Sequence, residues 1–159
     1  MSVQAAPLSL DDVDRRLIAA LAEHPRAGVL TLARLLGINR NTVQARLDKL
    51  VARGVITGFG PDVDLRAIGY DVLAYVTLEI AQGRTPDVVD HLREIPEVVE
   101  AHMVTGVGDL LCRVVARSNE DLARVINRVL DIAGINRTTT LLALTTPIPA
   151  RTLPAVHAH

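Results

Sequence analysis

Ala33, Gly37 and Val43 stand at the offsets found where two helices cross at a tight turn. Ala33 is small, so the helices can approach closely, and Val43 is apolar, so it can pack the second helix inward. Gly37 can take the positive φ of such a turn without a Cβ clash. The spacing predicts a helix-turn-helix, although a two-helix hairpin inside an all-α core also fits it.

Capping signals place three helices before residue 55. Ser9 is expected to cap the first, with Asp12 as the acidic half of a capping box, and Pro25 ends it. Thr31 is expected to cap a second, short helix that stops at the turn glycine. Asn39 caps the third, which runs to Arg53-Gly54 with its apolar side chains on one face.

The opposite face of this third helix is polar and basic, which is typical of a helix that enters the major groove of DNA. Arg40 can pair with guanine, and Asn41 or Gln44 with adenine, while residues farther along the helix can reach phosphates. The predicted DNA contacts are Arg40, Asn41, Thr42, Gln44, Arg46, Lys49 and Arg53. For any single one of them, a solvated helix face is an equally good interpretation. Aromatic residues are only 2% of the chain, which favours duplex DNA over single strands.

The charge distribution supports this interpretation more than the total does. The net charge is −1, yet residues 1–60 carry +3 and residues 61–159 carry −4. Residues 26–53 contain six cations and one anion, Asp48. A DNA-binding surface needs only a local excess of positive charge, so the first 60 residues are the predicted DNA-binding domain.

The remaining chain alternates between strand and helix patterns. Residues 55–61 predict a small hairpin, or wing, and 61–71 a hinge. Strands are expected at 72–80, 98–105, 110–116 and 138–144, and helices at 86–94 and from a Ser118 cap, with Asp121 as its partner, to about 131. This order, βαββαβ, is the ferredoxin-like pattern, so residues 72–147 form a second domain and 148–159 an irregular tail. The predicted fold class is therefore α+β.

These segments together resemble the Lrp/AsnC family of transcription regulators, from about residue 10 to residue 147. The motifs are Leu10-Asp11-x-x-Asp14-x-x-Leu17-Ile18, Leu32-Ala33-x-x-Leu36-Gly37-Ile38-Asn39, Val43-x-x-Arg46-Leu47-x-x-Leu50, Gly54-Val55-Ile56-x-Gly58-Phe59 with Ile68-Gly69, and Thr105-Gly106-x-x-Asp109-Leu110-Leu111. The resemblance implies a winged helix-turn-helix, a βαββαβ effector domain and binding to partly palindromic DNA. It also implies homodimers that assemble into tetramers, octamers or larger discs, with an amino-acid effector between adjacent dimers. Many family members carry tyrosine where this chain has Leu110.

The turn at 105–109 is the predicted effector site. Its glycines let backbone N–H groups converge on a carboxylate, Asp109 can pair with an ammonium group, and Thr105 adds a hydroxyl. An ordinary glycine-containing hairpin turn is the alternative. The predicted effector contacts are Thr105, Gly106, Val107, Gly108 and Asp109, to which the resemblance adds Leu141 and Leu142 as apolar walls.

One face of the predicted sheet is expected to mediate self-association. Strand alternation gives it a mixed surface that suits an interface better than a core: Tyr75, Thr77, Glu79, Glu100, His102 and Arg113. We therefore expect a homodimer, which also matches paired DNA half-sites.

Other functions find less support in the sequence. The five histidines form no metal-ligand cluster, no cofactor fingerprint is present, and Cys112 is alone, so no metal or cofactor is predicted. No signal peptide or membrane span is visible, which predicts a cytoplasmic protein. A siroheme decarboxylase on the same architecture is the enzyme alternative, with His102 and Arg113 as its candidate residues.

Overall fold

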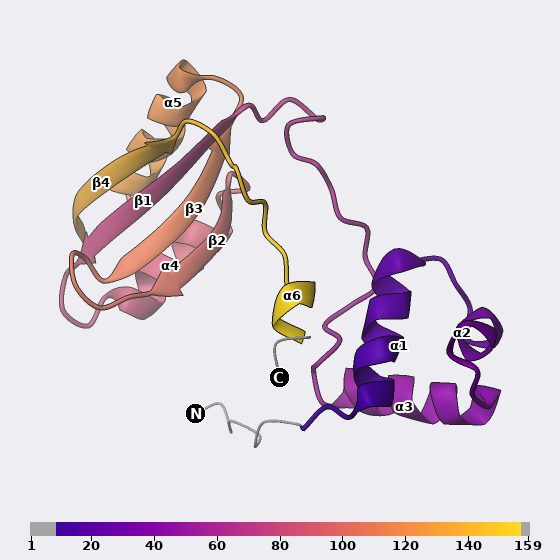
Figure 1. Ribbon diagram of the computed structural model, residues 1–159. Helices are drawn as coiled ribbons and strands as arrows, with labels where there is room; N and C mark the ends of the chain where they lie inside the picture. The colour runs from indigo at the N-terminus through magenta and orange to yellow at the C-terminus, as the bar shows by residue number, and fades with distance from the viewer. Residues whose placement is uncertain (1–8, 157–159) are drawn as a thin grey trace. The chain divides into compact units, whose positions relative to one another are not determined.

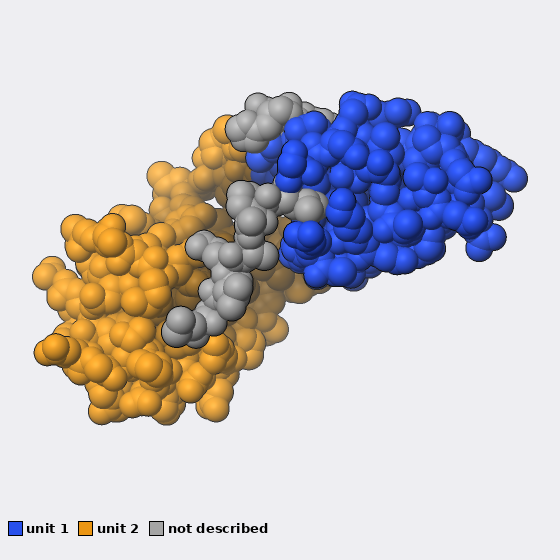
Figure 2. All heavy atoms as spheres, turned by 90° about the horizontal axis from the view of Figure 1, so that it is seen from below, with its two compact units in different colours: residues 1–62, 150–159 blue, residues 63–149 orange. Residues whose placement is uncertain are grey.

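The computed structural model describes residues 9–156, which divide into two compact units. One unit contains residues 9–62 together with 150–156, and the other contains residues 63–149 (Figure 2). Figure 1 shows the ten helices and strands formed by the described residues.

Three helices form the first unit: α1 (Asp12–Glu23), α2 (Val29–Leu36) and α3 (Arg40–Ala52). Their apolar faces meet in one core, in which Leu17, Leu32, Val43 and Leu50 are almost completely buried. Burying each such side chain contributes about 1.5–3 kcal/mol to folding. The core fixes which face of α3 remains outside, and this arrangement confirms the predicted helix-turn-helix.

The turn and the start of α3 form as the sequence predicts. Gly37 has a φ of 68° and ends α2, and the Asn39 side chain accepts a hydrogen bond from the Asn41 N–H at 2.8 Å. Gly54, just after α3, also has a positive φ of 69°. Glycine takes this conformation without steric cost, so both helices can end sharply.

The predicted starts of α1 and α2 were wrong. Asp11, not Ser9, caps α1, and Asp14 rather than Asp12 completes the capping box, because Asp14 stands three residues after the cap. Helix α2 begins at Val29 after Gly28, which has no side chain to cap it, and Thr31 lies inside the helix. Val29 packs against the core of this unit, so tertiary contact outweighs the missing cap.

The expected hairpin at 55–61 is absent from the structure, where these residues form no strand. The N–H groups of Val55 and Ile56 both donate to the Leu50 carbonyl, at 2.9 and 3.2 Å. They close the end of α3 and are not available for a strand ladder. The segment is therefore an irregular arm with Phe59 exposed on it.

The second unit is a four-stranded antiparallel sheet with the spatial order β2-β3-β1-β4. Its elements are β1 (Val72–Ile80), α4 (Thr85–Arg93), β2 (Val98–Met103), β3 (Leu110–Ala116), α5 (Asn119–Leu130) and β4 (Ile135–Ala143), which confirms the βαββαβ order. Residues of α4 and α5 share one core with the inward side chains of β1 and β3. Both helices thus cover the same face of the sheet, and no helix of this unit covers the other face, called the open face here (Figure 1). At one end of the open face Val115 is nevertheless buried, beside residues of the segments 63–70 and 146–149.

Two strand boundaries and one cap contact in this unit differ most from expectation. Strand β2 ends at Met103 because Val104 already donates to the Asp109 carbonyl and closes the following turn. Strand β4 begins at Ile135, since its pairing with β1 continues to Ile80. Ser118 caps α5 as predicted, but the Asp121 carboxylate accepts from the N–H of Arg117, one residue before the cap.

The tail after β4 contains a short helix, α6 (Leu153–Val156), where an irregular segment was expected. Residues 150–153 line a hollow of about 680 Å³ together with Leu21 and Phe59 of the first unit. The end of the described chain thus belongs to the helical unit, although β4 belongs to the sheet.

Candidate functional site

Helix α3 presents its polar face outward. Val43 and Leu50 are completely buried on the inward face, and Leu47 is half-buried beside them. Six of the seven predicted DNA contacts are exposed: Arg40, Asn41, Thr42, Gln44, Lys49 and Arg53. The seventh, Arg46, is half-buried. The side chains expected to meet a DNA groove are therefore accessible on this unit.

Asp48 is the one acidic residue on α3, and it has a hydrogen-bond partner on the same helix. The Gln44 amide donates a hydrogen bond to the Asp48 carboxylate at 2.8 Å, one helical turn away. Gln44 must keep or exchange this bond when it approaches a base. The pair also directs the Asp48 charge along the helix surface.

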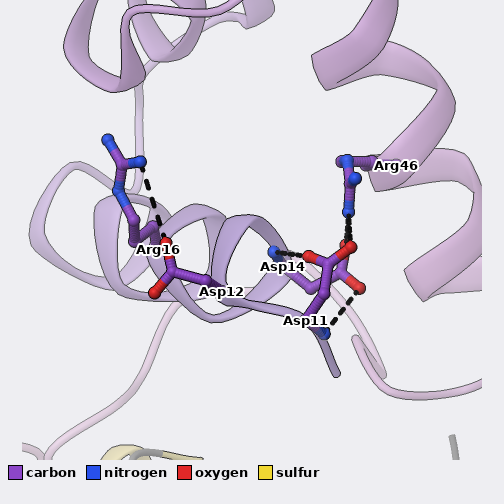
Figure 3. Close-up of polar contacts among 5 residues, drawn as sticks. All are labelled: Asp11, Asp12, Asp14, Arg16 and Arg46. Atoms are coloured by element: carbon purple, nitrogen blue, oxygen red, sulfur yellow. Dashed lines mark hydrogen bonds and ion pairs between the residues drawn. The ribbon is translucent and has the colours of Figure 1, made fainter. Parts of the chain in front are cut away.

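Arg46 points to the start of α1 (Figure 3). Its Nη1 lies 2.6 Å from Asp11 Oδ2 and 2.7 Å from Asp14 Oδ1. The hydrogen bond from Arg46 is the main cause that lowers the pKa of Asp11, and the same pair raises the pKa of Arg46. From the sequence, Asp11 and Asp14 were not predicted to bind Arg46, although two aspartates three residues apart at a helix start were a visible signal.

A shallow hollow of about 500 Å³ lies between the start of α1 and the outward face of α3. Asp11, Asn41, Thr42, Ala45, Arg46 and Lys49 line it. The ion pair therefore lies directly beside side chains that are predicted to contact DNA.

The predicted effector turn connects β2 to β3. Gly106 and Gly108 have φ values of 113° and 94°, and the described structure records no hydrogen bond from the N–H groups of residues 106–108. Asp109 fixes the base of the turn, because its N–H donates to the Leu78 carbonyl at 2.8 Å and its Oδ2 accepts from the Ile80 N–H at 2.7 Å. The turn can thus present its N–H groups to a ligand from a fixed base. One oxygen of the Asp109 carboxylate, however, already accepts a hydrogen bond from Ile80.

Leu141 and Leu142 are not brought to this turn within one chain. Leu141 pairs with Tyr75 and Leu142 with Ala74, three and four residues along β1 from Leu78, where the turn is anchored. Strand β4 also lies on the other side of β1 from β3. Neighbouring residues of a strand point to opposite faces, so the two leucines cannot form one wall.

The residues of the enzyme alternative lie on the open face of the sheet. His102 Nε2 is 2.8 Å from Glu100 Oε1, and Arg113 Nη1 is 3.8 Å from Glu100 Oε2. Within residues 9–156, no three His, Cys, Asp or Glu side chains are grouped so that they could hold a metal ion. Over the same residues, no helix is both long and apolar enough to cross a membrane.

A helix-turn-helix with an exposed polar α3, joined to a separate antiparallel sheet unit, defines a two-domain DNA-binding transcription regulator. A family model described as the AsnC-type helix-turn-helix domain matches residues 10–51, and one described as the Lrp/AsnC ligand binding domain matches residues 73–153. The chain belongs to the Lrp/AsnC family.

Similar proteins agree with this assignment. The regulatory protein AsnC of Escherichia coli K12 is 32% identical over 141 residues, which cover 87% of this chain and 93% of that protein. The solved structure of E. coli AsnC has a TM-score of 0.85 and 31% identity, and the match covers 92% of this chain and 100% of that one. A feast or famine regulatory protein of Mycobacterium tuberculosis, complexed with L-methionine, has a TM-score of 0.80 and 30% identity and covers 91% and 98%.

The names of these relatives also distinguish a transcription regulator from the enzyme alternative. The matched curated relatives are transcriptional regulators, so this chain is a DNA-binding regulator and not an enzyme. The siroheme decarboxylase alternative has no support from them.

Proposed function

We propose that α3 carries sequence recognition in duplex DNA. Arg40, Asn41, Thr42 and Gln44, at its N-terminal end, approach base edges, whereas Lys49 and Arg53 approach phosphates. The observation that carries this proposal is the division of α3, whose apolar residues are buried while these polar ones are exposed.

Two variants test this division of roles. The full-length protein first selects a preferred duplex from a random-sequence pool, and a shuffled duplex of the same composition serves as the non-specific probe. Arg40→Ala is expected to lower affinity for the selected duplex at least ~10-fold and to leave the shuffled duplex nearly unaffected. Lys49→Ala is expected to weaken both duplexes similarly. Equal loss on both duplexes for Arg40→Ala would remove it from base recognition.

We further propose that the regulator responds to an amino acid. The support is the turn at 105–109, whose free N–H groups suit a carboxylate. A relative of 30% identity was solved in complex with L-methionine. Because Leu141, on the open face, is remote from the turn of its own chain, a site that combines this leucine with the turn requires a second copy. Binding then shifts the balance between assemblies. Apart from this effector, we propose no cofactor.

A thermal-shift screen of the twenty amino acids tests the sensing proposal. A ligand that binds only the folded protein raises its melting temperature. The matched variant is Thr105→Val, which removes the hydroxyl and keeps the side-chain shape, and we expect a smaller shift for the same ligand. If none of the twenty shifts the wild-type protein, the sensing proposal fails while DNA binding stands.

Self-association through the open face of the sheet completes the proposal. Tyr75 and Leu141 are neighbours on β1 and β4 and are both exposed on this face in a single chain. Such an apolar surface with charged neighbours is typical of protein interfaces. We propose a homodimer that assembles further into a tetramer or octamer, in the cytoplasm, where a bacterial or archaeal regulator meets its DNA.

A further inference from the structure

Two carboxylates at the start of α1, those of Asp11 and Asp14, also bind a side chain from the middle of α3. Asp11 Oδ1 accepts from the Asp14 N–H at 2.9 Å, and Asp14 Oδ2 accepts from the Asp11 N–H at 3.4 Å, which together form the capping box. The remaining oxygen of each carboxylate receives Arg46 Nη1. The same two residues therefore begin one helix and bind the other.

The two acidic partners differ in their surroundings. The Asp14 side chain is 3% exposed, whereas the Asp11 side chain is 54% exposed and lies in the hollow beside Asn41 and Lys49. Among the described residues, Asp14 is the one polar or charged residue that is buried. A buried carboxylate without a cation is costly, so Arg46 is the group that makes this burial possible.

The buried side chains that α1 and α3 contribute to the shared core, Leu17, Val43 and Leu50, are apolar. Apolar contacts have no preferred direction, so they allow a helix to rotate or slide by small amounts. The ion pair from Arg46 is directional, and it leaves α3 on the flank between the buried Val43 and Leu50 and the exposed face. It therefore fixes the rotation of α3 about its own axis.

We infer that Arg46 is a positioning residue, which holds α3 in its DNA-binding orientation through Asp14 and Asp11, and that it is not a phosphate contact. Two carboxylates on one guanidinium give the cluster a net charge of −1, which would repel a phosphate. The cations left for phosphates on α3 are then Lys49 and Arg53. This inference rests on the proposed use of α3 in DNA recognition.

The dependence of DNA affinity on salt separates the two roles. We define the salt slope as the size of the decrease in log K for each unit of log salt concentration. Each lost phosphate contact lowers this salt slope by about one. With the selected and shuffled duplexes above, Arg46→Gln is expected to weaken the selected duplex at least ~10-fold, with an unchanged slope and little effect on the shuffled one. Lys49→Gln is the control, for which the slope falls by about one. A lower slope for Arg46→Gln with equal losses on both duplexes would overturn the inference.

Substituting Asp14 gives a second test, because the electrostatic and the positioning role predict opposite changes in affinity for the selected duplex. Asp14→Asn removes a negative charge, so a purely electrostatic role predicts tighter binding of every duplex. The positioning role predicts weaker binding of the selected duplex and unchanged or tighter binding of the shuffled one. Equal tightening of both duplexes would contradict the inference.

A second acidic variant keeps the test decisive if either substitution unfolds the helical unit, as judged by circular dichroism. Asp11→Asn changes the exposed partner and leaves the Asp14 pair in place. We expect it to reduce the preference for the selected over the shuffled duplex, and an unchanged preference would count against the inference. Failure of the proposed function is seen separately, when Arg40→Ala and Lys49→Gln both leave DNA binding unaffected.

Discussion

Gly108 lies against Thr77 so closely that no side chain fits between them. A Cβ at position 108 would meet Thr77 Cγ2 at 2.3 Å and the Leu78 carbonyl oxygen at 3.0 Å. The turn between β2 and β3 is thus pressed onto the end of β1. This contact, together with the two hydrogen bonds of Asp109, holds the predicted effector turn in place.

The first prediction compares the two glycines of this turn. Gly106→Ala introduces only backbone strain, because nothing lies near its added Cβ, and it is expected to cost about 1 kcal/mol. Gly108→Ala adds a steric overlap to the same kind of strain and is expected to cost about 2–4 kcal/mol. Urea unfolding followed by circular dichroism measures both. Equal losses would show that the contact with Thr77 relaxes freely.

The second prediction concerns self-association through the open sheet face. Leu141 is 61% exposed on β4, and Leu130 is 43% exposed on α5, which covers the opposite face. Leu141→Asp places a charge in the proposed interface and is expected to weaken the dimer at least ~10-fold, whereas Leu130→Asp leaves it intact. Sedimentation equilibrium of both variants gives the dissociation constants. Dissociation by Leu130→Asp alone would move the interface to the helices.

The third prediction concerns acid stability at the start of α5. The Arg117 N–H, and next Arg124, lower the pKa of the Asp121 carboxyl. A lowered folded-state pKa stabilises the protein above the ordinary value of 3.8, and this contribution disappears as the pH falls through the folded-state value. Asp121→Asn should therefore flatten the fall in melting temperature below pH ~4. An unchanged pH profile in the variant would refute this contribution.

The fourth prediction concerns the single cysteine. Cys112 is buried in the sheet core, and burial raises the pKa of its thiol to about 11, from 9.0. At pH ~8 the native protein should contain about 100-fold less thiolate than the unfolded chain, so Ellman's reagent should react quickly only after unfolding. The stability that depends on this neutral thiol is present below the ordinary pKa and is lost as the pH rises towards 11. Fast labelling of the native protein would show that the sheet opens readily.

Strands β1 and β3 were among the most predictable parts of the fold. Strands β1 and β3 have the bounds that alternation and β-branched residues predict, because one face of each strand packs on α4 and α5. The helix-turn-helix was also visible, since its turn glycine and its Asn39 cap act over a few residues. Features that depend only on neighbouring residues, such as a turn glycine or a helix cap, can be predicted from the sequence.

Choices between competing local signals were less predictable. Ser9 and Asp11 are both good caps, and Asp11 prevails through a contact with Arg46, 35 residues away along the chain. Residues 55–61 have the composition of a hairpin, but two of their N–H groups are taken by the end of α3. Such outcomes depend on distant partners, which a single sequence does not display.

The candidate sites show the same limit. Exposure of the α3 contacts followed from helical periodicity, but the engagement of Arg46 by two carboxylates did not. The placement of Leu141 and Leu142 on opposite faces follows from strand alternation, which the family resemblance alone did not take into account.

The return of residues 150–156 to the helical unit makes the sheet an insertion between two parts of one fold. Grafting this sheet unit onto another DNA-binding domain would consequently need two splice points, near 62/63 and near 149/150. A chimera joined only near 62/63 would keep residues 150–156 of this chain but would lack the helical unit to which they belong. Affinity tags and fluorescent reporters fused beyond residue 156 would likewise be attached to the DNA-binding unit, as would tags fused before residue 9.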